Sequence, residues 1–235
     1  MTELLHLELP VRARALPPQG IIECWLIPLA DLALPSSSNA DQNARQALRL
    51  RRQFLLRLIL GAYLQRPGKD IELVRGSSGK PALAPALADS GLQFNLSHSG
   101  EWLALALARD VAVGIDIEQH RSLARAAELG RRYFSPQEAD HLDALDEPQR
   151  SRCFFELWTV REACIKAMGS SLAQSLRELV LAPDSAQVLN LPADWPPARD
   201  WTRLRPALPA PLEVCIAAPQ PDLGVQTIWL DCAPA

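Results

Sequence analysis

The spacing of apolar and polar residues along the chain predicts both strands and helices. Continuous or alternating apolar runs predict strands at residues 21–27, 71–74, 92–96, 102–108, 111–117, 212–217 and 226–230. Arg109 and Asp110 lie between two of these runs, and a gap of this length suits a tight hairpin. Ten of the twenty prolines fall in residues 181–235, so this region is expected to be irregular around its strands.

Three longer segments have the periodicity of helices. Residues 43–64 place apolar side chains on one face, at Leu48, Leu55, Ile59 and Ala62. A second helix is expected to begin at Ser135, because a proline follows this N-cap and Glu138 closes a capping box. A third should span residues 148–168 and end at Gly169. Since these elements lack a regular βαβ alternation, the fold class is α+β.

Composition and charge narrow the possible functions. The chain has 235 residues, of which 48 % are apolar and 22 % charged, as is usual for a globular protein of one large or two small domains. A net charge of −3 gives no general attraction to nucleic acid or to an anionic membrane. No signal peptide and no apolar stretch long enough to span a bilayer are visible, so a cytoplasmic protein is expected. Five cysteines without a CxxC pair favour buried thiols over disulfides or zinc.

The first candidate for chemistry is a pair of acids in the run VAVGIDIE. Alternate residues of a strand share a face, so Asp116 and Glu118 should point the same way, opposite the aliphatic residues. Two neighbouring carboxylates repel unless a cation lies between them, and hard oxygen ligands suit Mg²⁺. Gly114 leaves room on that face. The alternative is a strand whose outer face simply becomes polar.

A second candidate is the pair Glu162 and Lys166, one turn apart on the third predicted helix. An i, i+4 pair of this kind on a surface helix would contribute only a few tenths of a kcal/mol. This helix is apolar over most of its circumference, however, which indicates that its charged residues line a cleft. Lysine is also rare in the chain, which has only Lys69, Lys80 and Lys166.

Three further segments could bind an anion. The sequence FNLSHSG at residues 94–100 could hydrogen-bond a phosphate through backbone N–H groups, Ser97 and His98. A structural turn is the alternative; a serine hydrolase is disfavoured because adjacent strand residues point apart and no nucleophile elbow is present. The turn Gly76-Ser77-Ser78-Gly79 leads into Lys80-Pro81, where a lysine could meet a phosphate or simply face solvent. The stripe of Arg45, Arg49 and Arg52 could also bind a phosphate, or it could form a solvated face of the helix.

The order of these motifs is more specific than any one of them. GKP, FNLSHSG, GIDIE and W-x-x-R-E-A-x-x-K follow one another over residues 79–169. This arrangement resembles the Sfp-type phosphopantetheinyl transferases, the group that activates surfactin synthetase. GIDIE and the W-to-K segment are the diagnostic parts. The family often has lysine where this chain has Arg161, and arginine cannot easily move a proton.

The resemblance implies a fold of two similar α+β halves in a pseudo-twofold arrangement, with coenzyme A between them. We expect an N-terminal half at residues 1–110, on the adenosine and phosphate side, and a C-terminal half at residues 111–235, with the acids and the catalytic helix. The positions that match the family's metal ligands are Asp116, Glu118 and Glu162. The positions that match contacts to coenzyme A are Gly79, Lys80, Pro81, Ser97, His98 and Lys166, with Arg45, Arg49 and Arg52 as candidates near the 3′-phosphate.

The implied reaction moves the 4′-phosphopantetheine arm of coenzyme A to a serine of an acyl or peptidyl carrier protein and releases adenosine 3′,5′-bisphosphate. Mg²⁺ is the expected cofactor, Glu162 the expected general base, and Lys166 and His98 the groups expected to stabilise phosphate charge. The expected partners are coenzyme A and the carrier, without nucleic acid or membrane, and the protein is expected to be a monomer. The alternatives are another Mg²⁺-dependent nucleotide phosphotransferase and a non-catalytic module that binds coenzyme A or a carrier.

Overall fold

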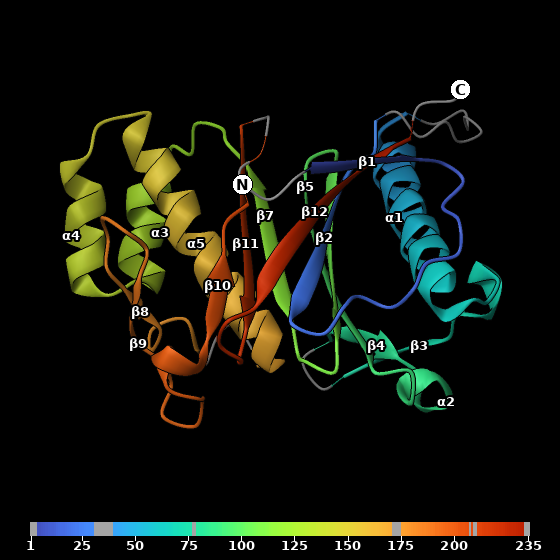
Figure 1. The fold of residues 1–235 in the computed structure, drawn as a ribbon. Coiled ribbons are helices and arrows are strands. Elements are labelled where there is room, and N and C mark those ends of the chain that lie inside the picture. The colour runs from blue at the N-terminus through green and yellow to red at the C-terminus, as the bar shows by residue number, and fades with distance from the viewer. Residues whose placement is uncertain are drawn as a thin grey trace.

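The structure of the protein is a computed structural model that describes residues 4–30, 40–76, 79–170, 175–206, 208 and 211–232, with the backbone alone at residues 40–44. Two groups of elements lie side by side (Figure 1). The first has helix α1 beside a large sheet, and the second has helices α3, α4 and α5 beside a smaller sheet. The fold is therefore α+β, as the sequence predicted.

The helices are α1 (Ala40–Leu64), α2 (Pro85–Ala88), α3 (Ala126–Tyr133), α4 (Pro136–Ala144) and α5 (Gln149–Met168). The strands of the first half are β1 (Leu4–Glu8), β2 (Ile21–Pro28), β3 (Leu73–Arg75), β4 (Pro81–Leu83), β5 (Leu92–Ser99) and β6 (Trp102–Arg109). The later strands are β7 (Gly114–Gln119), β8 (Val180–Leu181), β9 (Val188–Asn190), β10 (Thr202–Leu204), β11 (Leu212–Ala218) and β12 (Gly224–Asp231).

The first half is built on a five-stranded sheet of order β1-β12-β2-β6-β5. Helix α1 packs its apolar stripe against one face of this sheet, where Leu55 and Ile59 are completely buried beside Trp25 and Leu105. The predicted stripe of this helix is thereby confirmed. Strand β5 forms one edge of the sheet, and this edge faces the second half of the molecule.

The second half is built on a three-stranded sheet of order β10-β11-β7, with α5 packed against it. Twelve of the twenty residues of α5 are buried, so the helix is central to this half rather than a surface element. Its predicted end is confirmed, because Gly169 adopts a left-handed conformation with φ of 65°. The predicted capping box is also confirmed at the start of α4, where Ser135 and Glu138 each hydrogen-bond the other's backbone.

An apolar layer joins the two sheets. Ile22 and Leu26 of β2 pack in one cluster with Ile115 and Ile117 of β7 and with Ile216 of β11. Strand β12 also links the halves, because it follows the smaller sheet in sequence but pairs in parallel with both β1 and β2 of the larger one. The expected boundary between two halves, between residues 110 and 111, therefore stays a prediction. Strand β12 comes from the C-terminal half of the chain but lies within the first sheet.

Two sequence expectations are corrected by the strands near the junction. The predicted hairpin at Arg109-Asp110 is wrong, because β7 leaves β6 and pairs with β11 in the other sheet. Asp110 turns the chain with φ of 59°, and residues 111–113 carry it across before β7 begins. Strand β5 also extends to Ser99, beyond the predicted strand at residues 92–96, so FNLSHS forms a strand rather than a turn. Ser77 and Ser78 of the expected turn lie outside the described residues.

The remaining expectations concern burial and membranes. All five cysteines lie in the described part of the chain and are buried, as expected for small apolar side chains. Among the described helices, none is long and apolar enough to cross a membrane.

Candidate active site

The two sheets meet edge to edge along β5 and β7, and side chains of β5 make the connection. Asn95 Oδ1 accepts a hydrogen bond of 2.9 Å from the backbone N–H of Ile115. Ser97 Oγ donates to Asp116 Oδ1 at 2.7 Å, and Ser99 Oγ donates to Glu118 Oε2 at 2.7 Å. Alternate residues from Asn95 to Ser99 thus hydrogen-bond β7, because alternate strand residues share one face.

Strand β7 carries Asp116 and Glu118 on the face opposite its buried isoleucines, as the alternation predicted. This face is not open, because α5 covers the start of the strand. A Cβ atom on Gly114 would lie only 2.0 Å from the carbonyl oxygen of Ala163, so only glycine permits this close approach. The contact brings the acids of β7 next to the charged residues of α5.

Helix α5 completes the cluster with Lys166 and Glu162. Lys166 Nζ donates to Asp116 Oδ1 at 2.7 Å and to Ser97 Oγ at 3.1 Å. The carboxylate of Glu162 lies 3.9 Å from the same nitrogen. Residues from β5, β7 and α5 therefore converge, and five of them were predicted from sequence: Ser97, Asp116, Glu118, Glu162 and Lys166.

The electrostatics of this cluster oppose the charged form of its acids. Burial raises the pKa of Glu162 to about 7, and the neighbouring charges of Asp116 and Glu118 act in the same direction. Burial also raises the pKa of Asp116, although the ammonium of Lys166 and the hydrogen bonds from Lys166 and Ser97 oppose this shift. Asp116 Oδ2 is buried and has no hydrogen-bond partner. An unpartnered carboxylate oxygen in a buried site is costly, so the site favours a cation there.

The donor set fits a hard divalent ion. Asp116, Glu118 and Glu162 offer carboxylate oxygens, which are the ligands that Mg²⁺ prefers. They lie close enough that the charges of Asp116 and Glu118 both affect the pKa of Glu162. In the part of the chain that the structure describes, no three acidic, histidine or cysteine side chains already surround one point. The assignment of all three acids to one metal ion therefore stays a prediction, and Lys166 supplies positive charge beside Asp116.

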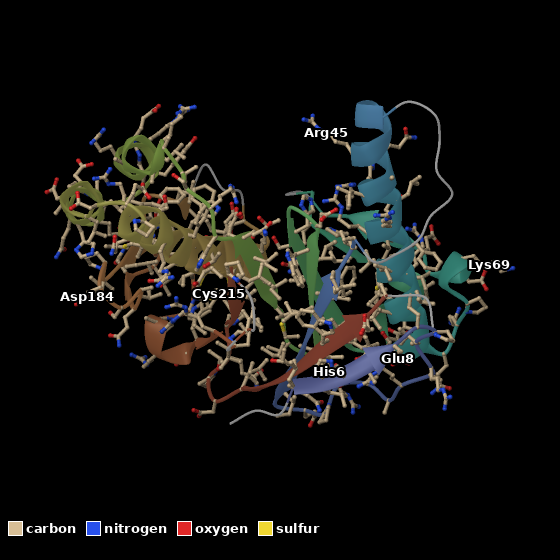
Figure 2. All side chains as sticks on the ribbon, turned by 90° about the horizontal axis from the view of Figure 1, so that it is seen from above. His6, Glu8, Arg45, Lys69, Asp184 and Cys215 are labelled. Atoms are coloured by element: carbon tan, nitrogen blue, oxygen red, sulfur yellow. The ribbon has the colours of Figure 1, made fainter. Side chains whose placement is uncertain are left out.

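The arginines predicted on α1 line a separate pocket. Its lining includes Arg45, Arg49, Arg52 and His98, and its volume is about 390 Å³. Arg45 extends from the first turns of α1 on the side that faces the second half (Figure 2). Arg75 of β3 also lines this pocket, and sequence reasoning missed it. Nothing in the sequence around this isolated arginine indicates that it lies near a helix that is distant in sequence.

His98 belongs to this pocket rather than to the acid cluster. Its side chain leaves β5 on the face opposite Ser97, which contacts Asp116 instead. Partial burial and the charge of Arg52 lower the pKa of His98. The neutral imidazole can still donate a hydrogen bond to a phosphate. The two residues of the motif thus serve two different regions, one on each side of the strand.

Lys80 is placed differently from the other predicted residues. Its ammonium donates to the backbone carbonyls of Val113 at 3.0 Å and of Lys166 at 2.8 Å. Gly79 turns the chain just before it with φ of 80°, and Pro81 begins β4. The contact of these three residues with coenzyme A therefore stays a prediction.

Arg161 is completely buried and points away from the acids. It forms an ion pair with the completely buried Glu138 of α4 and lies over the ring of Phe134, 4.1 Å from the ring centroid. It also donates to the carbonyl of Leu157 at 3.2 Å. Arg161 therefore anchors α5 to α4, and nothing in its position involves proton transfer at the site.

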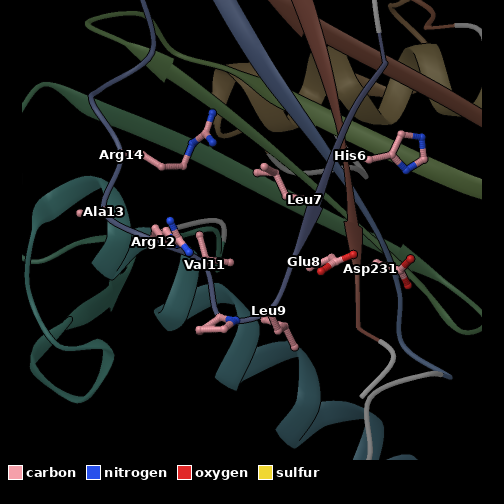
Figure 3. Close-up of a pocket in the computed structure, with 10 residues that line it drawn as sticks. His6, Leu7, Glu8, Leu9, Val11, Arg12, Ala13, Arg14 and Asp231 are labelled. Carbon is pink, nitrogen blue, oxygen red and sulfur yellow. The ribbon is translucent and has the colours of Figure 1, made fainter. Parts of the chain in front are cut away.

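Another pocket, of about 680 Å³, lies at β1 and the segment that follows it (Figure 3). Glu8 of β1 and Asp231 of β12 are register partners and lie side by side at its edge, across from Arg12 and Arg14. None of the residues predicted for the site lines it. Volume alone therefore does not identify the functional region of this protein.

Comparison with known proteins agrees with the order of the motifs. The 4′-phosphopantetheinyl transferase superfamily matches residues 112–205, and the N-terminal region of a 4′-phosphopantetheinyl transferase family matches residues 39–110. The chain is 34 % identical over 189 residues to the 4′-phosphopantetheinyl transferase HetI of Nostoc sp., which covers 74 % of this chain and 80 % of HetI. It is 34 % identical over 122 residues to Sfp of Bacillus subtilis, 52 % of each chain. It is 41 % identical over 103 residues to AcpT of Escherichia coli, 44 % of this chain and 51 % of AcpT.

The chain belongs to the 4′-phosphopantetheinyl transferase family. It is an enzyme that transfers the 4′-phosphopantetheine arm of coenzyme A to a carrier protein. The junction of β5, β7 and α5 brings together acids and a lysine, and the separate arginine pocket gathers positive charge.

Proposed function

We propose that the transfer takes place at the junction of β5, β7 and α5, with the assistance of Mg²⁺. The observation that carries this proposal is the buried carboxylate of Asp116. One of its oxygens accepts from Lys166 and Ser97, whereas the other has no partner. A buried acid placed in this way beside Glu162 is typical of a site that holds a cation.

Coenzyme A carries a pyrophosphate and a 3′-phosphate, so it requires a site rich in positive charge. We place its 3′-phosphate in the pocket of Arg45, Arg49 and Arg52, with His98 and Arg75 at the same pocket. Arginine suits this task because its guanidinium can bond two phosphate oxygens at once. We place the pyrophosphate beside Lys166, on the other side of β5 from this pocket.

Asp116, Glu118 and Glu162 are the residues that would hold Mg²⁺. When bound, the ion offsets negative charge on the pyrophosphate and on the departing adenosine 3′,5′-bisphosphate. The protein prepares this position by burying Asp116 and by bonding Glu118 to Ser99 and to Arg121. Such supporting contacts fix the orientation of the acids before substrate binds.

The side chains of the site then position the reaction and move one proton. The carrier's serine oxygen bonds to the β-phosphorus of coenzyme A, and the bond from that phosphorus to the bridging oxygen breaks. Glu162 accepts the serine proton, directly or through a water. Lys166 donates to the phosphate oxygens from its place between Asp116 and Ser97.

The partner of this reaction is an apo acyl or peptidyl carrier protein, and we expect the enzyme to act as a monomer. The two halves divide the work in this proposal. Residues 1–110 hold the adenosine end of coenzyme A, and residues 111–235 provide the acids and α5.

The experiment is mass spectrometry of several apo-carriers after incubation with the enzyme, coenzyme A and Mg²⁺. A gain of one phosphopantetheine arm on the carrier serine is expected with wild type and not with Asp116→Asn or Glu162→Gln. The fold of each variant is checked by circular dichroism. Release of nucleotide without a carrier would instead favour another phosphotransferase, and binding of coenzyme A without turnover of any carrier would favour a non-catalytic module.

A further inference from the structure

Lys80 joins three segments that are distant in sequence. It lies directly before β4, whereas its two acceptors are Val113, just before β7, and Lys166, in the last turn of α5. Both acceptors are backbone carbonyls, so the bonds fix the path of the chain rather than the position of a side chain. Through one ammonium group, the β3–β4 hairpin of the first half is tied to the second half.

The two acceptors lie at the closest approach of β7 and α5. Gly114 follows Val113 directly, and its α-carbon faces the backbone of α5 between Ala163 and Ala167. Lys166 lies within the same stretch of the helix. Lys80 therefore bonds both sides of the contact that sets β7 against α5. The same contact determines how Asp116 lies relative to Lys166.

The hairpin that Lys80 holds also reaches the arginine pocket. β3 pairs with β4 through Arg75 and Pro81, and Arg75 donates to the carbonyl of Gly79 at 3.1 Å. Arg75 lines the pocket together with Arg49 of α1. The hairpin is thus the element that reaches both the pocket for the nucleotide and the helix with Glu162.

The energetics favour a structural use of this ammonium. Burial lowers the pKa of Lys80 to about 8, which reflects the cost of taking its charge out of water. Two carbonyl bonds offset part of this cost, since a buried charge needs hydrogen-bond partners. The carbonyl of Lys166 also lies near the C-terminal end of a twenty-residue helix, where a positive charge is favourable. Lys69, in contrast, is exposed.

We propose that Lys80 is a positioning residue that clamps the β3–β4 hairpin to β7 and α5. In this role it sets the alignment of the nucleotide pocket with the acids before coenzyme A binds. The proposal rests on the proposed function for the identity of those two regions, but the clamp itself is a property of the ligand-free protein. The motif that carries Lys80 resembles a phosphate-binding turn in sequence, yet its ammonium is directed at the backbone.

The test compares wild type with Lys80→Met, which keeps the apolar stem but removes the charge, and with Lys80→Arg, which keeps two or more donors. Lys69→Met is the matched control. Amide hydrogen exchange of the ligand-free proteins is measured at residues 79–84 and 164–170. In Lys80→Met, exchange should accelerate about tenfold or more in both segments, and Lys69→Met should match wild type.

Kinetics then separate positioning from binding. Lys80→Met should lower kcat about tenfold or more, because small misplacements of reacting groups cost rate, while the KM for coenzyme A stays within about threefold. Lys80→Arg should restore kcat to within about threefold of wild type. If Lys80→Met does not fold, Lys80→Gln, which retains one amide donor, is measured in the same way.

Two results would overturn the clamp. Unchanged exchange with a large rise in the KM for coenzyme A would make Lys80 a phosphate ligand. Accelerated exchange with an unchanged kcat would leave Lys80 without a role in positioning. Failure of the acid-site proposal is distinguishable from both results. It would appear as transfer activity in Asp116→Asn, whereas amide hydrogen exchange in ligand-free Lys80→Met is measured without any reaction.

Discussion

The acid cluster and the arginine pocket lie on opposite faces of one strand, yet they are built in different ways. Ser97 of β5 faces the cluster, and His98 faces the pocket. In the cluster, each charged group is at least partly buried and has its own partners. In the pocket, Arg45 and Arg49 are exposed along one helix.

This difference separates two tasks. In a buried cluster, each residue has its own role and its own partner. The loss of any one residue leaves its partner unpaired and should abolish the transfer reaction. An exposed group of like charges shares the work of attracting a phosphate, so the loss of one arginine should weaken binding and leave the chemical step intact.

The largest expected effect is on the chemistry of the cluster. Glu162→Gln removes the proposed proton acceptor, and Asp116→Asn removes the acid with the unpartnered oxygen. Glu162→Gln should lower kcat by about 1,000-fold, within the range of general acid–base catalysis. Asp116→Asn should lower it by about as much, because it removes a proposed ligand of the divalent ion. The measurement is the initial rate of carrier labelling at saturating coenzyme A. Activity within tenfold of wild type for either variant would contradict the division of tasks.

The next effect concerns stability rather than chemistry, at the anchor of α5. Arg161→Met leaves Glu138 buried without its ion-pair partner, which should lower the free energy of unfolding by about 3–5 kcal/mol. Arg152→Met, at an exposed position of the same helix, is the control and should change little. Urea denaturation measures both.

The double variant Arg161→Met/Glu138→Gln sharpens this result. It should recover part of the loss, because no unpaired charge remains buried. A loss as large in the double variant as the two single losses combined would show that the ion pair is not the cause.

A smaller effect is the pH dependence of the metal-free protein. Because Glu162 has its pKa raised to about 7 from an ordinary 4.5, the folded state binds its proton more tightly than the unfolded state. This contribution to stability is complete below about pH 4.5 and is lost as the pH rises through about 7. Relative to Glu162→Gln, metal-free wild type should therefore lose up to about 3 kcal/mol over this window.

Chemical denaturation at several pH values in the presence of a chelator checks this expectation. Mg²⁺ should reduce the loss, since it binds the deprotonated acids. Parallel pH profiles for wild type and Glu162→Gln would show that Glu162 titrates normally.

The smallest effect is expected in the arginine pocket. Arg52→Gln should raise the KM for coenzyme A about tenfold with kcat within about twofold, because one of several charges is lost. The effect should shrink at high salt, since salt screens charges that solvent reaches. Arg57→Gln, on the same helix but outside the pocket lining, is the matched control. A fall in kcat with an unchanged KM would show that the pocket acts in the chemical step, and would contradict the division of tasks between the two regions.

Local rules explain which parts of the site were predictable. The alternation in β7 placed Asp116 and Glu118 on one face, the capping box set the start of α4, and Gly169 set the end of α5. These features depend on neighbours within a few residues, where sequence patterns are reliable.

The missed features depend on contacts between distant segments. The chain after Asp110 resembles the second arm of a hairpin, but the approach of Gly114 to α5 and the pairing with β11 carry β7 into the other sheet. Sequence reasoning considered Arg161 only as the replacement of the family's lysine, yet the residue is buried against Glu138 of α4. A partner that lies twenty or more residues away leaves no periodic trace in the sequence.

The central claim is that Asp116, Glu118 and Glu162 bind one divalent ion together. Titration of Mn²⁺ into the protein with coenzyme A, followed by the electron paramagnetic resonance signal of the free ion, measures this directly. One bound ion is predicted for wild type, with affinity at least about tenfold weaker in Asp116→Asn and in Glu162→Gln. Equal binding by all three proteins would contradict the account.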